Sequence, residues 1–236
     1  ALPMEYPTYG SADLRTPAFH AEYETGSAVT CLSYCGYAIY PGKKTLSALP
    51  ATYVESESEA DTLEITLVDS LTGLKIIISY SVFEDYDVIT KSVHAVNEGT
   101  QPIDVQSILS STTYLFDKNY EFVHLTGAWA RERHIQKQPL MNGTMQIDSK
   151  RVASGHIHSP FLALARPWAT ENQGEVYGYS FVYSGNFIMQ AETNQQDVVR
   201  VNIGINPFGF HWLLEPGEAF QAPEVVMTFS DSGFGT

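Results

Sequence analysis

The chain has 236 residues, a formal net charge of −14 and an apolar fraction of 44%. This much apolar material excludes an intrinsically disordered chain. The negative charge disfavours nucleic acid and anionic lipid as partners, because the long-range field repels phosphate groups. No run approaches the roughly 20 consecutive apolar residues of a membrane-spanning helix, and the first seven residues lack the basic and apolar regions of a secretory signal. We therefore expect a globular chain without nucleic-acid or membrane partners.

Apolar and polar residues alternate with a period of two along most of the chain, which is the pattern of half-buried strands. Residues 62–67 and 74–82 alternate on either side of a turn at residues 69–73, and this arrangement predicts a β-hairpin. Further strands are predicted at residues 88–96, 103–116, 175–183, 187–192, 198–203 and 220–229. Strands this numerous, with short turns and no helical spacing, predict an all-β fold, a large antiparallel β-sandwich or barrel.

The middle of the chain, residues 127–160, departs from this pattern. It is polar, rich in arginine and histidine and poorly alternating, so we expect long loops there. Loops on a rigid sheet scaffold commonly carry binding groups. Since no repeat or linker interrupts the chain, we predict one domain over residues 1–236.

The two cysteines, Cys31 and Cys35, are four residues apart in a predicted strand. Such residues share a face but lie roughly 13 Å apart, beyond the roughly 7 Å limit for a disulfide. Two unpaired thiols favour a reducing, cytoplasmic location.

Two acidic clusters invite comparison with the carboxylate pair of a glycosidase. Glu55, Glu57 and Glu59 alternate with serines, which is more typical of a solvated extended edge. The acidic residues at positions 84–87 lie between two predicted strands, where a turn is the better interpretation.

His156 and His158 share one face of an extended segment, a spacing that metal sites use. The sequence supplies no third ligand, so hydrogen-bonding histidines are favoured, and we predict no metal and no cofactor.

The most suggestive segment runs through Trp129, Arg131 and Arg133. An indole beside two guanidinium groups can stack on a sugar and donate to its hydroxyls. Equally, Trp129 can fill a core while the arginines pair with acidic residues. Trp168 and Trp212 allow the same two interpretations, with a functional role less favoured.

Several collinear segments resemble one family. They include GAWARER at residues 127–133, YSGNF at 183–187 and GINPF at 204–208, together with residues 5–10, 13–18, 49–55, 83–90, 159–164, 174–178 and 223–226. Over nearly the whole chain they resemble the N-terminal domain of bacterial α-galactosidases of glycoside hydrolase family 36. Gly209 and Ser159 depart from the family pattern, where Asp and Asn are expected.

The resemblance implies a supersandwich, similar to galactose mutarotase, that precedes a (β/α)8 barrel and a C-terminal β domain. The family hydrolyses terminal α-D-galactose from melibiose, raffinose and related oligosaccharides, and its two catalytic aspartates belong to the barrel. No catalytic residue is therefore assigned in this chain. Many members are tetramers in which this domain packs beside a neighbour's barrel.

The resemblance and the polar middle segment together give candidates for contact with substrate or with a partner: Trp129, Arg131, Arg133, Arg151, His156, Asn186 and Asn206. We expect an apolar patch where the barrel would dock, with Trp129 on it. Two alternatives stay open. One is an independent carbohydrate-binding module with Trp129 as its platform, and the other is a sugar epimerase that uses His156 or Glu175 as acid or base.

Overall fold

The computed structural model describes residues 3–235 and is almost entirely β-structure. Its strands are β1 (Phe19–Tyr23), β2 (Ser33–Pro41), β3 (Asp61–Asp69), β4 (Leu74–Phe83), β5 (Val88–Asn97), β6 (Ile103–Leu115), β7 (Glu121–Ala128), β8 (Arg131–Pro139), β9 (Gly143–Asp148), β10 (His158–Ala165), β11 (Val176–Val182), β12 (Phe187–Thr193), β13 (Val199–Ile205), β14 (Trp212–Leu214), β15 (Ala219–Gln221) and β16 (Glu224–Ser230). Two 3-10 helices, η1 (Glu57–Glu59) and η2 (Glu84–Tyr86), complete the elements. The predicted all-β fold is confirmed.

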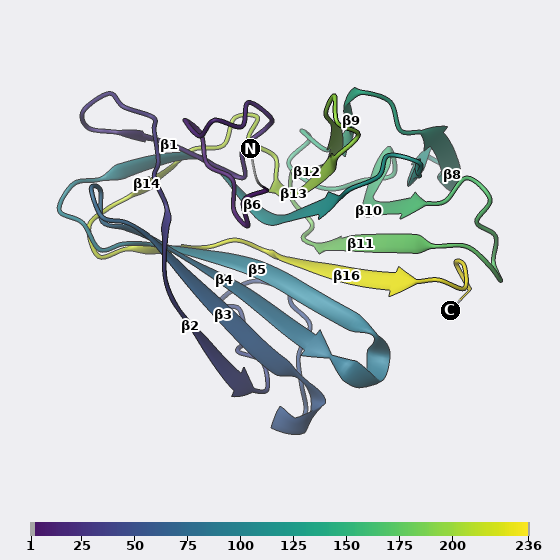
Figure 1. Cartoon of the computed structure of the whole chain (residues 1–236), viewed down its shortest axis with the longest axis horizontal. Coiled ribbons are helices and arrows are strands. Elements are labelled where there is room, and N and C mark those ends of the chain that lie inside the picture. Colours follow the sequence, from purple (N-terminus) through teal and green to yellow (C-terminus); the bar gives the residue numbers. More distant parts are fainter. Residues whose placement is uncertain (1–2, 236) are drawn as a thin grey trace.

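The strands form two antiparallel sheets. In Figure 1, strands β2 to β5, β16 and β11 of the larger sheet lie below the smaller sheet, whereas β10 and β8 of the larger sheet lie beside β12 and β9. The smaller sheet has the order β1-β6-β13-β12-β9, with β14 also paired to β6. The larger sheet has the order β2-β3-β4-β5-β16-β11-β10-β7-β8, with β15 also paired to β5. This is the predicted sandwich.

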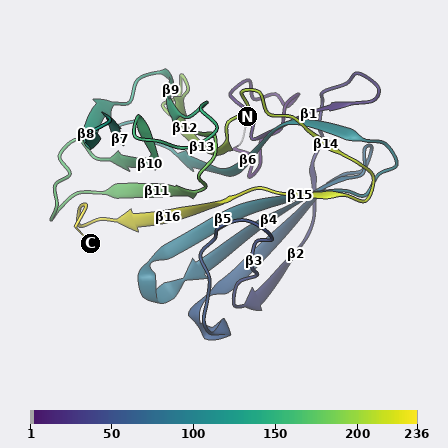
Figure 2. The ribbon, with the colours of Figure 1, turned by 180° about the vertical axis from the view of Figure 1, so that it is seen from behind.

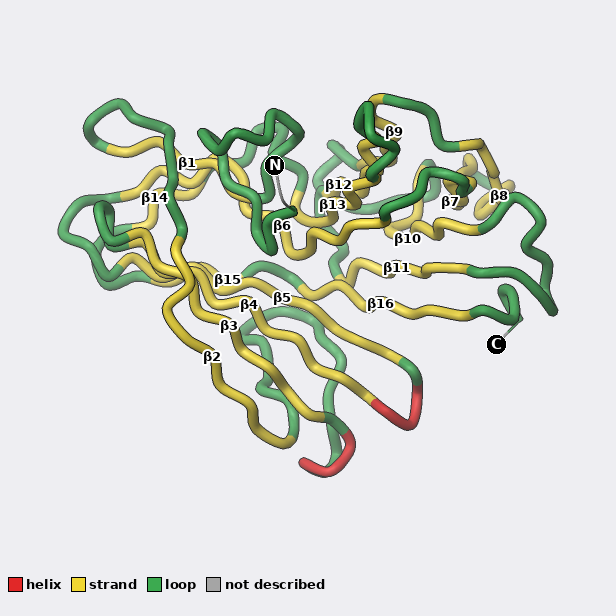
Figure 3. The backbone as a smooth tube through the Cα atoms, in the orientation of Figure 1, coloured by secondary structure: helices red, strands yellow, loops and turns green. Residues whose placement is uncertain are grey.

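Two apolar clusters fill the space between the sheets. One joins β1 and β6 to the beginning of β4 and the end of β5, and the other joins β12 and β13 to β10, β11 and β16. Beyond the first cluster, strands β2 to β5 diverge from the smaller sheet (Figures 1 and 3). We call these four strands the arm. Its inner face continues the face that lines the core, and its outer face points away from the smaller sheet.

The predicted loops at residues 127–160 are wrong in large part. β8 and β9 lie within this segment, and β7 pairs with β8 along its length. All nine residues of β8 are exposed because the strand is the edge of the larger sheet. A strand that buries neither face has no apolar alternation, so period-two patterning does not detect it.

Smaller differences have local causes. Glu57 and Glu59 belong to η1 instead of an extended edge, since Ser56 and Glu59 form a capping box, although the region is solvated as expected. The turn expected at residues 84–87 is confirmed as η2. The strand predicted at residues 220–229 is divided into β15 and β16 at Pro223, which has no backbone N–H to donate.

Cys31 and Cys35 are exposed and unpaired, as expected. Across residues 3–235, no helix is long and apolar enough to cross a membrane.

Candidate functional site

The β7–β8 hairpin presents three of the predicted site residues together. Trp129 at its tip is 85% exposed, and Arg131 and Arg133 are exposed on β8. The ladder shifts register after Thr126, where a Cβ on Gly127 would lie 2.4 Å from the carbonyl oxygen of Arg131. Only glycine permits this close approach. The hairpin thus holds an indole and two guanidinium groups in solvent.

The loop at residues 149–157 lies beside this hairpin. The Oγ1 atom of Thr126 donates to the carbonyl oxygen of Ile157 at 2.7 Å, and the backbone N–H of Gly127 donates to the same oxygen at 3.1 Å. Arg151 and His156 are exposed and line a pocket of 280 Å³ formed by this loop and its flanking residues. Five of the predicted site residues therefore lie on the β7–β8 hairpin and on the loop beside it.

Asn186 and Asn206 hold the same loop in place. The side-chain oxygen of Asn186 accepts a hydrogen bond from the backbone N–H of Val152 at 2.7 Å. Asn206 is buried, donates to the carbonyl oxygen of Ser149 at 3.1 Å and accepts from the backbone N–H of Phe208 at 3.0 Å. These contacts place both amides beneath the loop, where they position it.

His156 and His158 do not form a metal site. Among residues 3–235, no cluster of three or more potential ligands is present. His158 packs against His124, with ring centroids 5.6 Å apart. Burial lowers the pKa of both His124 and His158, so both imidazoles are neutral near pH 7.

Glu175 lies at the other end of β10 from His156. Its carboxylate accepts hydrogen bonds from Tyr120 at 2.6 Å and from Arg166 at 3.1 Å. Burial opposes ionisation, but the hydrogen bonds from Tyr120, Tyr177 and Arg166 prevail and lower the pKa of Glu175. An ionised, ion-paired carboxylate is a poor general acid, and the fold does not bring Glu175 together with His156.

The other two tryptophans are also partly exposed. Trp212 begins β14 and packs against Phe220, with ring centroids 5.2 Å apart, whereas Trp168 lies in the connection after β10. Neither joins the hairpin site.

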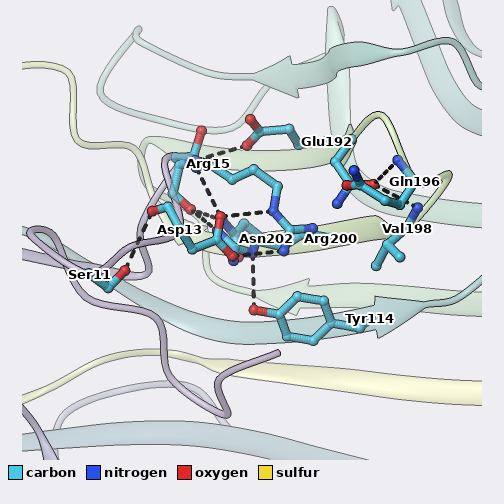
Figure 4. A network of polar contacts seen from close by, with 11 residues as sticks. Ser11, Asp13, Arg15, Tyr114, Glu192, Gln196, Val198, Arg200 and Asn202 are labelled. Atoms are coloured by element: carbon cyan, nitrogen blue, oxygen red, sulfur yellow. Dashed lines mark hydrogen bonds and ion pairs between the residues drawn. The ribbon is translucent and has the colours of Figure 1, made fainter. Parts of the chain in front are cut away.

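A buried ionic network was missed by sequence reasoning (Figure 4). Arg200 on β13 is completely buried and forms an ion pair with Asp13, which also accepts a bidentate ion pair from Arg15. The Arg200 guanidinium also donates to Tyr114 at 3.1 Å and to the carbonyl oxygen of Thr16 at 3.1 Å. No sequence signal distinguishes Arg200 from the exposed arginines, because its partner lies 187 positions away.

The free end of the arm exposes an apolar surface. Tyr37 and Ile39 on β2 are each 67% exposed, and Val82 on β4 and Ile89 on β5 are also exposed. The register places all four on the inner face. We call them the open face. β2 and β8 are opposite edges of the larger sheet, so Trp129 does not belong to the open face, and its place on a surface that meets the barrel stays a prediction.

Comparisons with known proteins agree on one family. The profile of the glycosyl hydrolase family 36 N-terminal domain matches residues 1–215. Alpha-galactosidase AgaA of Geobacillus stearothermophilus is 50% identical over 232 residues, which are 98% of this chain and 32% of that protein. Alpha-galactosidase Mel36A of Lactobacillus acidophilus is 37% identical over 233 residues, which are 99% of this chain and 32% of that protein.

The solved structures show the same relationship. The crystal structure of the GH36 alpha-galactosidase AgaB from Geobacillus stearothermophilus superposes with a TM-score of 0.97 at 50% identity, covering 98% of this chain and 32% of that one. The chain spans about a third of the length of these relatives. On its sequence and its fold, the chain belongs to the N-terminal domain family of glycoside hydrolase family 36.

Proposed function

We propose that this chain is the non-catalytic N-terminal domain of an α-galactosidase that releases terminal α-D-galactose from melibiose- and raffinose-type oligosaccharides. The observation that carries the proposal is collinear similarity over 98% of the chain to a third of an α-galactosidase. A related GH36 enzyme has been solved in complex with raffinose. In this proposal the catalytic aspartates belong to a barrel outside the residues of this chain.

A direct assay tests whether this chain is non-catalytic. The purified chain should show no hydrolysis of an aryl α-galactoside above the uncatalysed rate, while the full-length protein carrying it hydrolyses the same substrate. Turnover by the chain alone would overturn the proposal.

The role of the domain in the proposal is to dock on the barrel through the open face. Monomeric proteins rarely leave contiguous large apolar side chains in solvent. Here Tyr37 and Ile39 on β2 share one face of the arm with the neighbouring pair Val82 and Ile89, with β3 between the two pairs, and no other strand covers this surface in residues 3–235. In this proposal, the barrel of the full-length enzyme covers this surface.

Thermal inactivation of the full-length enzyme tests the docking. Ile39→Lys places a charge in the contact, so we expect the inactivation temperature to fall by roughly 5 °C. The melting temperature of the isolated chain should not change, because Ile39 is exposed there. Leu71→Lys, on the exposed turn between β3 and β4, is the matched control. Equal effects of the two variants would rule out the open face.

We propose a second contact, between the β7–β8 hairpin with its neighbouring loop and another subunit of a homo-oligomer. Its residues are Trp129, Arg131, Arg133, Arg151 and His156, with Asn186 and Asn206 positioning the loop. Trp129→Ala should shift the full-length protein towards smaller assemblies in sedimentation, whereas Trp168→Ala should not. An unchanged assembly would contradict this contact.

The exposure of Trp129 also favours a second candidate function, a carbohydrate-binding module. The indole is 85% exposed beside two free guanidinium groups, as a sugar platform requires. Calorimetry with galactose and melibiose tests it, because Trp129→Ala should lower the heat that the unaltered chain gives. Equal heats for the two chains at millimolar sugar would exclude this module.

A cytoplasmic location completes the proposal. It is supported by two exposed thiols, Cys31 and Cys35, which persist unpaired in a reducing compartment.

A further inference from the structure

The outer face of the arm contains a second, separate pocket. The loop that follows β2, residues 42–56, crosses this face; in Figure 2 it runs in front of β3 to β5. We call it the roof loop. Between the roof loop and the sheet lies a pocket of 380 Å³, within the range of small-ligand sites. The pocket is on the outer face of the arm, whereas the open face is on the inner face. A barrel that docks on the open face therefore leaves the pocket accessible.

The register of β4 and β5 fills the floor of this pocket with hydroxyl groups. Ser81 on β4 pairs with Thr90 on β5, and Ser79 pairs with Ser92. The next pair on the same face is Ile77 with His94. Because side chains alternate across a strand, all of these point to the outer face. The floor therefore offers hydroxyls in a regular grid with one apolar position and one imidazole.

Two of these hydroxyls have no hydrogen-bond partner in the part of the chain that the structure describes. Thr90 is 2% exposed and Ser92 is 6% exposed, yet neither side chain has a hydrogen bond within residues 3–235. Neighbouring Thr62 differs, because it bonds to Ser81 and to the carbonyl oxygen of Gly42, each at 2.7 Å. Neither hydroxyl oxygen is among the fully enclosed side-chain atoms that lack a partner in these residues, so each oxygen stays accessible from the pocket that it lines. The two free hydroxyls are thus placed to bind a polar molecule in the pocket.

The charges around the pocket cancel. Lys44 forms an ion pair with Glu64 at 2.8 Å, and the same carboxylate accepts from the hydroxyl of Tyr40 at 2.8 Å. Lys43 is paired with Glu224. Burial lowers the pKa of His94, so its imidazole is neutral near pH 7. A site with balanced charge and free hydroxyls suits a neutral ligand better than an anion or a cation.

The roof loop is anchored firmly enough to keep the pocket formed. Lys43 and Glu224 are both buried, with Nζ and Oε2 2.7 Å apart. Glu224 also accepts from the backbone N–H and the hydroxyl of Thr52, at 2.7 and 2.9 Å. Charge-assisted bonds of this kind are the strong ones. Because these contacts hold the roof loop in place before a ligand binds, the entropic cost of binding is lower.

From these contacts we propose that the roofed pocket binds a small neutral polyol of monosaccharide size. Thr90, Ser92, Ser79 and His94 supply hydrogen bonds to its hydroxyls, and Glu64 accepts from one of them. Ile77 lies under its apolar C–H face. The site is distinct from the β7–β8 hairpin and does not depend on the proposed hydrolytic function.

Titration of the isolated chain with galactose, followed by NMR chemical shifts, tests the proposal. We expect saturable shifts at millimolar galactose that involve Ser79, Thr90 and Ser92. Thr90→Val keeps the shape of the side chain but removes the hydroxyl, so affinity should fall about tenfold. Thr66→Val, on the same outer face but outside the pocket, should bind as the unaltered chain does. Thermal melting checks that each variant is folded.

Three comparisons separate the possible outcomes. Galactose against raffinose distinguishes a free monosaccharide from the end of an oligosaccharide, and raffinose should bind more weakly because a pocket of 380 Å³ offers little room beyond one sugar ring. Galacturonate should bind more weakly, because the charges of the pocket are already paired. Trp129→Ala should leave the shifts unchanged. Loss of binding in Trp129→Ala, equal affinity of Thr90→Val, or no shifts up to about 50 mM galactose would each overturn the proposal, the last showing a pocket filled by water alone.

Discussion

The inner face of the arm carries apolar side chains that lie in solvent at its free end, whereas its outer face carries hydroxyls and charges beneath a loop. Ile39 and Tyr37 are open on the first face, while Thr90 and Ser92 are buried on the second. Ordinary surface sheets are arranged the other way round. The contrast indicates that the inner face is made to meet another protein surface, and that the outer face encloses a small polar space.

Part of the inner face is covered by the smaller sheet, and the open face lacks such a cover. Ile76 and Ile78 on β4 are completely buried against β6 and its neighbours. Towards the end of β4 the smaller sheet no longer covers it, and Val82 is exposed. The apolar pattern continues without a break across this boundary, so the sequence is suited to burial along the whole strand.

The largest expected effect concerns the anchor of the roof loop. Glu224→Gln leaves the ammonium group of Lys43 buried without a counter-charge, and breaking a buried pair in this way costs about 3–5 kcal/mol of unfolding free energy. Urea unfolding measures it. Glu98→Gln is the control, since the Lys75–Glu98 pair is exposed and should contribute at most about 1 kcal/mol. A loss of unfolding free energy below about 1 kcal/mol for Glu224→Gln would mean that the Lys43–Glu224 pair does not anchor the roof loop.

The next prediction compares two isoleucines of the same inner face. Ile78→Ala should destabilise the chain by about 2–5 kcal/mol, because the side chain is fully buried. Ile39→Ala should change the unfolding free energy by less than about 0.5 kcal/mol, because it is largely exposed. Chemical denaturation of the two variants gives both values. Similar losses would show that the open face is packed in the isolated chain.

A pH titration examines the buried ionic network of Asp13, Arg15 and Arg200. The hydrogen bonds from Arg15, together with the charge of Arg200, lower the pKa of Asp13 to about 2. A lowered pKa contributes stability above the unfolded value of about 3.9, and this stability is lost as the pH falls through about 2. Between about pH 4 and 2, the urea midpoint should fall more for the unaltered chain than for Asp13→Asn. Parallel curves would remove Asp13 from the acid response.

The sequence predicts the arm well because its two faces differ in polarity. Residues 62–67 and 74–82 alternate strictly, and β3 and β4 follow them closely. β8 was not predicted, since an edge strand that is exposed on both faces leaves no periodic signal. Exposure is a property of the assembled sheet, so alternation alone does not show that Ile78 is covered and Ile39 is open.

The candidate sites were predicted unevenly for a related reason. An indole beside two arginines is visible in the sequence, and the structure places all three on one hairpin. The network around Arg200 and the pocket above Thr90 need partners that are distant in sequence. Thr90 and Ser92 look like the solvent face of an ordinary strand until the roof loop is placed over them.

The smallest expected effect extends the comparison to the opposite edge of the sheet. Trp129→Ala should change the unfolding free energy of the isolated chain by less than about 0.5 kcal/mol, because the indole makes little contact with the rest of the chain. Its loss should remove a solvent-exposed, long-wavelength component from the tryptophan fluorescence. Trp212→Ala should cost more, since that indole packs against Phe220. If Trp129→Ala destabilises the chain as Ile78→Ala does, the hairpin is packed internally, and the open face of the arm remains as the surface proposed for protein contact.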